Sequence, residues 1–343
     1  MSRERMIGSR SLSEGEDLFN YALRPAWLKD YVGQERTIAK LKISLEAAQQ
    51  RGEPIEHILL HGPPGLGKTT LAHITANEMK TKLIATSGPA LTRPGDLVGI
   101  LTSLKTSEIL FIDEIHRLGT AVEEFIYPAM EDFKVDFVVD KGAFAKTINI
   151  PLQKFTLVGA TTRAGLLSAP LRNRFGIHYH IDFYPFEDIK EIVRRAAHKL
   201  EVSIDEEALY EIAKRSRGTP RISNRILRRV RDYCQVKGDG TIAKDITVKA
   251  IELEGIDELG LDVLDRKYLR VIIENYRGGP VGIEAIAATL NEETNTLEEV
   301  IEPYLLKAGF IERTRLGRKI TEKVYKHLQI KPLKGQVKIF HNS

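Results

Sequence analysis

The segment Gly62–Thr70, which reads GPPGLGKTT, constrains what this chain can fold into more than any other stretch. It follows a short apolar run and precedes an apolar-periodic stretch, LAHITANEM, which predicts a helix. In a strand–turn–helix unit, the pattern GxxxxGK followed by Ser or Thr lets successive backbone N–H groups and the helix N-terminus face phosphate oxygens. A chance match in a glycine-rich turn is the competing interpretation, and the flanking strand and helix argue against it. The segment therefore predicts a phosphate-binding loop.

The side chains of this loop indicate how a nucleoside triphosphate would be held. Lys68 would pair with the β- and γ-phosphates, and the Thr69 hydroxyl would ligate Mg²⁺. We therefore expect a nucleoside triphosphate and Mg²⁺ as ligands, and the family resemblance described below implies that the nucleotide is ATP. The candidate ATP-binding residues of the loop are Gly65, Gly67, Lys68, Thr69 and Thr70.

Two adjacent acids follow a second buried run. The apolar residues Ile109–Ile112 lead directly into Asp113 and Glu114. At a strand end, such a pair places one carboxylate at the metal and the other beside the attacking water. Asp113 is then the candidate Mg²⁺ ligand and Glu114 the candidate general base. Taken alone, the pair could equally be a helix N-cap and a solvated acid, but together with the phosphate loop it predicts nucleotide hydrolysis.

Four short apolar runs predict buried strands: Ile58–Leu60, Leu83–Ala85, Ile109–Ile112 and Phe155–Val158. They alternate with helical patterns, which is typical of a parallel sheet wrapped by helices. Each run ends in a loop that carries polar residues, where open α/β sheets bind ligands. The expected fold class is therefore α/β.

A β-hairpin is predicted between the last two of these strands, in the segment KVDFVVDKGAFAKTINI at residues 134–150. Apolar residues alternate on either side of Lys141-Gly142, as they do in hairpin strands. The apolar residues of the segment are Val135, Phe137, Val139, Ile148 and Ile150. They exceed what one small hairpin can bury upon itself, so some should form an exposed interaction site. Packing on the parent sheet is the alternative.

The chain is long enough for two or three domains. We expect a flexible lead at residues 1–20, a large sheet domain at 21–184, a helical domain at 185–255, a third domain at 256–334 and a tail at 335–343. A Gly218-Thr219-Pro220 break interrupts the helical domain, and LEGIDELGLD is suited to link it to the third domain.

The third domain contains a helix, a GGPVGI turn, two more helices, the segment GFIERTRLGRKIT and a short last helix. Three helices and a hairpin suggest a winged-helix domain. From Phe310 to His327 there are six Lys or Arg and two Asp or Glu, and this excess of four equals the net charge of +4 of the whole chain. A basic wing suits contact with DNA phosphates, which positions a duplex without reading its sequence. A merely solvated hairpin is the alternative.

Composition excludes several other classes. The chain has no run of about 18 apolar residues, so no transmembrane helix is expected. The opening MSRERMIGSRSLSEGEDL lacks the apolar core of a secretory signal. The single cysteine, Cys234, excludes an internal disulfide and a cysteine-rich zinc site. We expect a cytoplasmic protein with no membrane partner.

Five motifs, GPPGLGKTT, ILFIDEIH, GATTR, LRNRFG and RGTPRISNR, occur in the order and spacing of AAA+ ATPases. The residues within these motifs resemble those of the RuvB family, whose members drive branch migration of Holliday junctions. The resemblance extends from about residue 20 to residue 330. It implies an AAA+ P-loop domain with a parallel sheet, a small all-α lid domain and a C-terminal winged-helix DNA-binding domain. It also implies a hexameric, ATP-dependent DNA translocase of recombination and DNA repair.

The resemblance assigns roles to the four catalytic candidates, Glu114, Thr162, Arg174 and Arg221. Thr162 matches sensor 1, whose hydroxyl responds to the γ-phosphate. Arg174 matches the arginine finger, which reaches the ATP of a neighbouring subunit; the sequence alone leaves Arg172 as an equal competitor. Arg221 matches sensor 2, and its place just after Thr219-Pro220 at a helix start would fix its direction.

Further contacts are also implied by the resemblance. The matches to the adenine side are Leu23, Arg24 and Tyr184, which generic packing explains almost as well. In the wing, Arg313 and Arg318 match DNA contacts, and Arg315 is a further candidate. Thr294 stands where some relatives carry a basic residue, so no DNA contact is assigned to that helix.

The implied partners are the duplex arms of Holliday junctions, the junction-binding protein RuvA, the RuvC resolvase and other copies of the chain in a homohexamer. Two other functions compete. One is an AAA+ replication initiator or clamp-loader-like switch, against which stand the hairpin and the lack of a cysteine-rich zinc element. The other is a protein unfoldase adaptor, which the missing pore-loop aromatic disfavours.

Overall fold

The computed structural model describes residues 23–138, 147–238 and 240–331, apart from the side chains at positions 137, 138 and 147. The predicted lead and tail lie outside these residues. The chain forms two compact units. The first contains the described residues up to Lys199 together with Gly218–Asn224, and the second contains Leu200–Arg217 and the described residues from Arg225 onward.

A five-stranded parallel sheet is the centre of the first unit, with the strand order β2-β3-β6-β1-β7. Its strands are β1 (Ile58–His61), β2 (Leu83–Ser87), β3 (Ile109–Asp113), β6 (Thr156–Thr161) and β7 (Ile177–His180). All four predicted runs are strands of this sheet, so the α/β expectation is confirmed.

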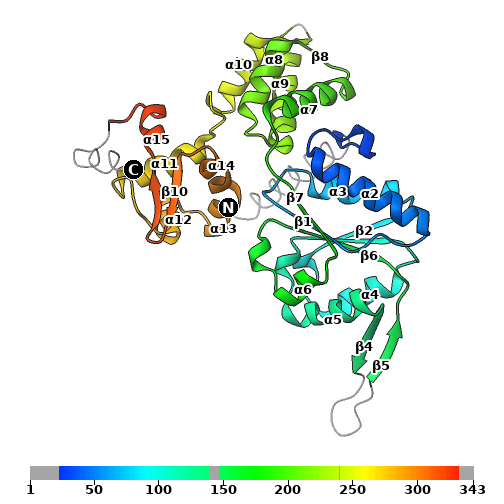
Figure 1. Cartoon of the computed structure of the whole chain (residues 1–343). Helices are drawn as coiled ribbons and strands as arrows, with labels where there is room; N and C mark the ends of the chain where they lie inside the picture. Colours follow the sequence, from blue (N-terminus) through cyan, green and yellow to red (C-terminus); the bar gives the residue numbers. More distant parts are fainter. Residues whose placement is uncertain (1–22, 139–146, 239, 332–343) are drawn as a thin grey trace, which may run out of the picture. The chain divides into compact units, whose positions relative to one another are not determined.

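Helices cover both faces of the sheet, with α2 and α3 on one side and α4, α5 and α6 on the other (Figure 1). The helices of this unit are α2 (Glu35–Arg51), α3 (Lys68–Glu78), α4 (Pro94–Ser103), α5 (Thr120–Glu131), α6 (Ala169–Asn173) and α7 (Phe186–Lys199). Short 3-10 turns occur at Leu28–Asp30, Gly88–Ala90, Ile115–Arg117 and Ala164–Leu166. The helix predicted after the phosphate loop is α3, which begins at Lys68.

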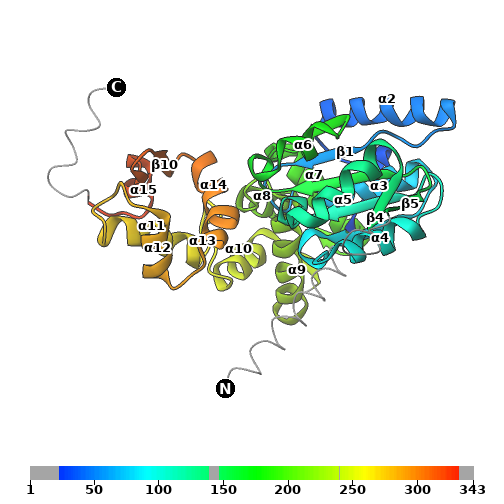
Figure 2. The same cartoon turned by 90° about the horizontal axis from the view of Figure 1, so that it is seen from below.

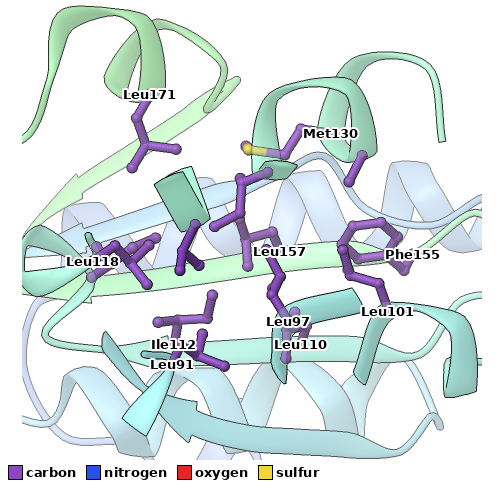
Figure 3. Close-up of a cluster of buried hydrophobic side chains, with 14 of the residues drawn as sticks. Leu91, Leu97, Leu101, Leu110, Ile112, Leu118, Met130, Phe155, Leu157 and Leu171 are labelled. Atoms are coloured by element: carbon purple, nitrogen blue, oxygen red, sulfur yellow. The ribbon is translucent and has the colours of Figure 1, made fainter. Parts of the chain in front are cut away.

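Buried apolar side chains fill the space between the sheet and the helices α4 to α6 (Figure 3). Leu110 of β3 and Leu157 of β6 contribute from the sheet, while Met130 of α5 and Leu171 of α6 contribute from the helices. Because these central strands are buried, the starting points of the loops at their carboxyl ends are fixed by packing.

The predicted hairpin is confirmed as an antiparallel pair, β4 (Lys134–Val138) and β5 (Thr147–Pro151), whose connecting turn lies outside the described residues. Val135 is fully buried in the core of the unit, and Ile150 is half-buried. Ile148 has 49% of its surface exposed. Among its described side chains, the hairpin therefore packs Val135 into the parent domain and presents Ile148 to solvent. Val139 and the side chain of Phe137 lie outside the described residues.

Helices dominate the first part of the second unit, with α8 (Glu206–Arg215), α10 (Lys244–Leu253) and the greater part of α9 (Pro220–Lys237). The expectation of helices alone was wrong in one detail. The two-residue strands β8 (Ser203–Ile204) and β9 (Thr241–Ile242) pair in parallel. Ile242 of β9 is fully buried, and burial of this apolar side chain stabilises so short a pairing.

The second part of this unit is a winged helix, and Figure 2 shows its helices around the β10–β11 wing. Its elements are α11 (Val263–Glu274), α12 (Ile283–Leu290), α13 (Thr294–Thr296), a π-helical turn (Leu297–Ile301), α14 (Glu302–Lys307), β10 (Ile311–Thr314), β11 (Gly317–Ile320) and α15 (Glu322–His327). The predicted hairpin of this domain is confirmed, and it pairs Arg313 with Arg318 across its two strands. Tyr268, Ile272 and Phe310 are buried at the centre of this part.

The two parts of the second unit are joined by a buried arginine. Arg217 adopts a left-handed backbone conformation, with φ at 57°, just after α8. Its Nε donates a 2.6 Å hydrogen bond to the carbonyl of Gly260, and its guanidinium forms an ion pair with buried Asp265 of α11. In the part of the chain that the structure describes, no helix is long and apolar enough to span a bilayer.

Candidate nucleotide-binding site

The phosphate loop takes its shape from glycines at positions where a side chain cannot fit. Gly62 has a φ of 146°, and a Cβ there would lie 2.0 Å from the carbonyl oxygen of Ile181. Gly67 has a φ of 100° and caps the N-terminus of α3. The loop therefore curls directly into the start of α3, where backbone N–H groups are free of helical partners and suit an anion.

The side chain of Lys68 is held against the same loop. Its Nζ donates hydrogen bonds to the carbonyls of Gly62, at 2.8 Å, and Pro63, at 2.9 Å. The residue is only 6% exposed. A lysine fixed at the base of a phosphate loop supplies a positive charge in a set position rather than a mobile surface charge.

The strand order brings the predicted acids and Thr162 to the same place, because β6 lies between β1 and β3. Asp113 ends β3, and its Oδ1 accepts a 3.0 Å hydrogen bond from the backbone N–H of Glu114. Thr162 follows β6, and its hydroxyl donates to Oε2 of Glu114 at 3.2 Å. Glu114 adopts a left-handed conformation, with φ at 48°. A non-glycine residue in that region is a strained position of the kind found at functional sites.

His116 also contacts the candidate base, a role that the sequence did not suggest. Its Nδ1 lies 3.3 Å from Oε2 of Glu114 and 2.8 Å from the hydroxyl of Thr161. The side chain is only 4% exposed. Its place two residues after Glu114 within ILFIDEIH is visible in the sequence, but the contact depends on the turn at Ile115–Arg117.

Arg221 reaches the loop from the first turn of α9, which begins at Pro220. Its backbone N–H donates to the carbonyl of Gly65 at 3.3 Å. A Cβ on Gly65 would lie 3.0 Å from the Cβ of Arg221, so the loop and the helix start are in close approach. A side chain at position 65 would therefore push Arg221 away from the phosphate loop.

These residues line a cavity of about 350 Å³. It is lined by Arg24, Pro64, Gly65, Gly67, Lys68, Thr69, Thr70, Asp113, Glu114, Thr162, Pro220, Arg221 and Asn224. The cavity thus gathers predicted residues from the phosphate loop, the ends of two strands and the start of α9. The Thr69 hydroxyl and the Asp113 carboxylate are oxygen ligands of the type that Mg²⁺ prefers, and the loop amides and Lys68 suit phosphates.

A second cavity, of about 770 Å³, contains the predicted adenine-side residues Leu23, Arg24 and Tyr184. Tyr184 donates to the carbonyl of Leu66 at 3.2 Å and shares a 2.6 Å hydrogen bond with Tyr31. Burial raises the pKa of the Tyr31 phenol to about 12, although the hydrogen bond with Tyr184 lowers it. Burial also raises the pKa of the Tyr184 phenol, so both phenols are neutral at physiological pH. Arg24, Gly67, Thr70, Pro220 and Asn224 line both cavities.

Arg174 is not among the residues that line the phosphate cavity of its own chain. It follows α6, and its Nη1 donates to the carbonyl of Pro170 at 2.9 Å. Nη2 pairs with Glu131 at 3.2 Å, and the guanidinium lies 4.3 Å from the centre of the Tyr127 ring. Arg172, the competitor, is exposed. Arg172 does not line the phosphate cavity of its own chain either.

The wing arginines belong to the second unit, and two of them bind a buried carboxylate. Glu302 of α14 is fully buried, and it accepts hydrogen bonds from Nε of Arg313 at 2.9 Å and Nε of Arg318 at 2.7 Å. The Arg318 side chain is 14% exposed and the Arg313 side chain 48%. Arg315, near the wing tip, is exposed. Of the three predicted DNA contacts, Arg318 therefore has the least free surface.

The parallel sheet, the phosphate loop, the paired acids and the helix-borne arginine together define a P-loop ATPase of the AAA+ class. Three family models match the chain in succession: "Holliday junction DNA helicase RuvB P-loop domain" over residues 23–181, "RuvB AAA lid domain" over 184–257 and "RuvB C-terminal winged helix domain" over 258–329. The chain therefore belongs to the RuvB family, and it is an ATP-hydrolysing enzyme.

Known relatives agree over nearly the whole chain. The Holliday junction branch migration complex subunit RuvB of Desulfosudis oleivorans is 60% identical over 316 residues, which is 92% of each chain. The subunit of the same name from Kosmotoga olearia is 56% identical over 97% of this chain and 96% of its own. The solved structure of the Thermotoga maritima RuvB Holliday junction branch migration motor is 54% identical, covers 90% of this chain and 99% of its own, and superposes with a TM-score of 0.84.

Proposed function

We propose that this chain is a cytoplasmic, ATP-driven DNA translocase that assembles into a hexameric ring and drives branch migration of Holliday junctions in recombination and DNA repair. The observation that supports this most directly is the succession of three RuvB domains over residues 23–329. A replication initiator or clamp-loader-like switch is not favoured, since relatives that match more than nine-tenths of the chain are RuvB subunits.

ATP and Mg²⁺ would be held by the residues of the phosphate cavity. Lys68 binds the β- and γ-phosphates, and the loop amides around Gly65 and Gly67 bind phosphate oxygens. Thr69 and Asp113 supply the ligands for Mg²⁺, which neutralises phosphate charge when it is bound.

Hydrolysis requires a base that is correctly oriented toward water. Glu114 accepts the proton of the attacking water, and the hydrogen bond from Thr162 fixes one oxygen of its carboxylate. Arg221 adds positive charge from the start of α9, where it lines the cavity. Arg174 acts on the ATP of a neighbouring copy, which would make a ring of subunits the active form.

The hairpin would dock the junction-binding protein RuvA, with the RuvC resolvase acting in the same pathway. Exposed Ile148 is the apolar side chain that supports this role. Replacing Ile148 with serine should abolish stimulation of the ATPase by RuvA, while basal hydrolysis and the thermal midpoint stay nearly unchanged. Asn149, exposed next to it, offers the matched control, since Asn149→Ser should keep the stimulation. A large fall in thermal stability of Ile148→Ser would instead indicate a packing role.

The wing would contact DNA phosphates through Arg313 and Arg315, with Arg318 holding the wing in place through Glu302. Removing one phosphate contact lowers the slope of log K against log salt by about 0.9. We therefore expect Arg315→Ala to flatten the slope by about one unit, equally for two unrelated duplexes, in anisotropy titrations over a salt series. Arg270→Ala removes an exposed arginine of α11 and is the control. Loss confined to one duplex would point to base readout and would favour an initiator.

The proposed function is tested most directly by comparing effectors of ATP hydrolysis. A branch-migration motor should be stimulated most by a four-way junction with RuvA, less by linear duplex and not by an unfolded protein. Movement of a labelled junction should depend on ATP and should be absent in Lys68→Ala. Equal stimulation by the junction and the linear duplex, with no junction movement, would contradict branch migration.

A further inference from the structure

The guanidinium of Arg174 lies over the ring of Tyr127, a residue that the nucleotide site does not use. The guanidinium carbon is 4.3 Å from the centre of the ring. A guanidinium is planar and its N–H groups lie in that plane, so an aromatic ring can hold it by one face without using a donor. The ring therefore restricts the orientation of the Arg174 side chain and leaves its hydrogen-bonding edge to other partners.

Two hydrogen bonds at this edge leave donors for a further partner. The terminal nitrogens donate to the carbonyl of Pro170 at 2.9 Å and to the carboxylate of Glu131 at 3.2 Å. Each terminal nitrogen carries two N–H groups, so each of them retains one. The Glu131 side chain is 55% exposed, and a partly solvated ion pair of this kind is weak. A phosphate oxygen could therefore replace Glu131, while the ring would still hold the guanidinium.

Tyr127 is itself fixed at both ends of its side chain. Its ring packs against the buried core of the first unit. Its hydroxyl donates to Oε1 of Glu123 at 2.5 Å and lies 3.3 Å from the hydroxyl of Ser168. Ser168 also donates to Glu123, and it caps the N-terminus of α6 by accepting a hydrogen bond from the backbone N–H of Leu171. Tyr127 is thus connected to the start of the same short helix that Arg174 follows.

The three residues of α5 that take part in these contacts share one face of the helix. Glu123, Tyr127 and Glu131 are spaced by four residues, which is about one helical turn. Two of them contact Arg174 directly, and the third fixes the hydroxyl of the ring. One face of α5 therefore sets the direction of the candidate arginine finger.

We propose that Tyr127 is a positioning residue for ATP hydrolysis, whose ring orients the Arg174 guanidinium toward a phosphate of the ATP bound by a neighbouring copy of the chain. This inference rests on the proposed role of Arg174 between subunits, and it adds the residue that orients the finger. Tyr127 lines neither nucleotide cavity. Its loss should therefore lower kcat and leave the affinity for nucleotide unchanged.

Two substitutions of Tyr127 test the role of the ring. Tyr127→Leu keeps an apolar side chain against the core but removes the aromatic face, whereas Tyr127→Phe keeps that face. Misplacing a catalytic group by about 1 Å costs about 100-fold in rate. At saturating ATP, Tyr127→Leu should lose about that factor in kcat, and Tyr127→Phe should keep most of the hydrolysis. Calorimetry should give both variants the ADP affinity of the wild type.

Two results of this comparison would overturn the proposal. One is a wild-type kcat in Tyr127→Leu, which would show that the finger needs no ring beneath it. The other is an equal loss in Tyr127→Leu and Tyr127→Phe, which would assign the effect to the hydroxyl.

Phe125 provides the matched control, because it is a second aromatic residue of α5 that packs against the same core. Each residue advances about 100° around a helix, so Phe125 lies about 200° from Tyr127. Phe125→Leu should hydrolyse ATP like the wild type, and its thermal midpoint should be close to that of Tyr127→Leu. An equal loss of kcat in the two leucine variants would contradict a specific role of Tyr127.

Mixed rings test whether Tyr127 acts through the finger. Tyr127→Leu keeps its phosphate loop and Lys68→Ala keeps its finger, so their mixture should regain part of the hydrolysis. A mixture of Tyr127→Leu with Arg174→Ala should show no gain, because both variants are defective in the finger. A gain in this second mixture would overturn the proposal. So would the absence of a gain in the first mixture, provided that Arg174→Ala does regain activity with Lys68→Ala. If that last pair also stays inactive, the proposed action of Arg174 between subunits is itself contradicted.

Discussion

Replacing Arg174 with alanine is expected to remove most ATP hydrolysis and to leave nucleotide binding intact. An arginine finger that stabilises the charge of the transition state supplies about 10³–10⁵ in rate. Arg174 does not line the phosphate cavity of its own chain, so its loss should leave the affinity for ADP near the wild-type value. Steady-state hydrolysis at saturating ATP and calorimetric binding of ADP measure the two effects separately.

Mixing two inactive variants tests whether the finger acts between subunits. Lys68→Ala lacks the phosphate-binding lysine but keeps Arg174, and Arg174→Ala has the opposite defect. In mixed rings, some sites would combine an intact loop with an intact finger, so part of the activity should return. If mixed rings form and every mixing ratio stays inactive, Arg174 does not act on a neighbour.

Arg172 is the matched control for this experiment, since it lies two residues away and is exposed. Arg172→Ala should keep most of the hydrolysis. The opposite result, with Arg172→Ala inactive and Arg174→Ala active, would transfer the finger to Arg172. Arg174→Ala also removes the ion pair with Glu131, which could lower the stability of the fold. The thermal midpoint of each variant measures this effect separately from hydrolysis.

Much of the sheet domain was predictable because its signals are local. Each strand is a short apolar run, and the phosphate loop is a contiguous motif between a strand and a helix. The proximity of Glu114 and Thr162 could also be predicted from the sequence, because the carboxyl ends of parallel strands lie at the same edge of a sheet. These features depend on neighbouring residues and on simple topology.

The features that were missed depend on contacts between distant segments. His116 and Thr161 are 45 residues apart in the sequence, and neither residue type predicts the hydrogen bond between them. In the wing, charge counting predicted exposed arginines. It could not reveal that Glu302, outside the counted segment, binds two of them.

Replacing Glu302 with alanine is expected to destabilise the winged helix strongly. The fully buried carboxylate accepts hydrogen bonds from Arg313, Arg318 and the hydroxyl of Tyr268. Removing one member of a buried charge cluster typically costs about 3–5 kcal/mol, because the remaining charges lose their partner. Hydrogen exchange of the full-length protein should show this loss of protection in peptides from β10 and β11. Peptides from the five-stranded sheet of the first unit should be unaffected.

Glu298 offers the matched control. Its carboxylate pairs with Arg318 at 2.8 Å, but its side chain is 30% exposed. A partly solvated ion pair contributes about 0–1 kcal/mol, so Glu298→Ala should change the exchange in the wing little. Equal protection in Glu302→Ala and Glu298→Ala would show that the buried cluster does not hold the wing together.

The pH dependence of the wing provides an independent check on Glu302. Burial alone would raise the pKa of this carboxyl, but the hydrogen bonds from Arg318, Tyr268 and Arg313 hold the pKa below its usual range. A carboxyl whose pKa is lowered on folding binds more protons in the unfolded state, so its stabilising contribution is present at neutral pH and is lost as the pH falls through its folded pKa. In Glu302→Gln this contribution is absent. Protection factors in β10 and β11, which correct for the intrinsic pH dependence of amide exchange, should therefore fall less steeply with acid in Glu302→Gln than in the wild type, and equal pH profiles would contradict the assignment.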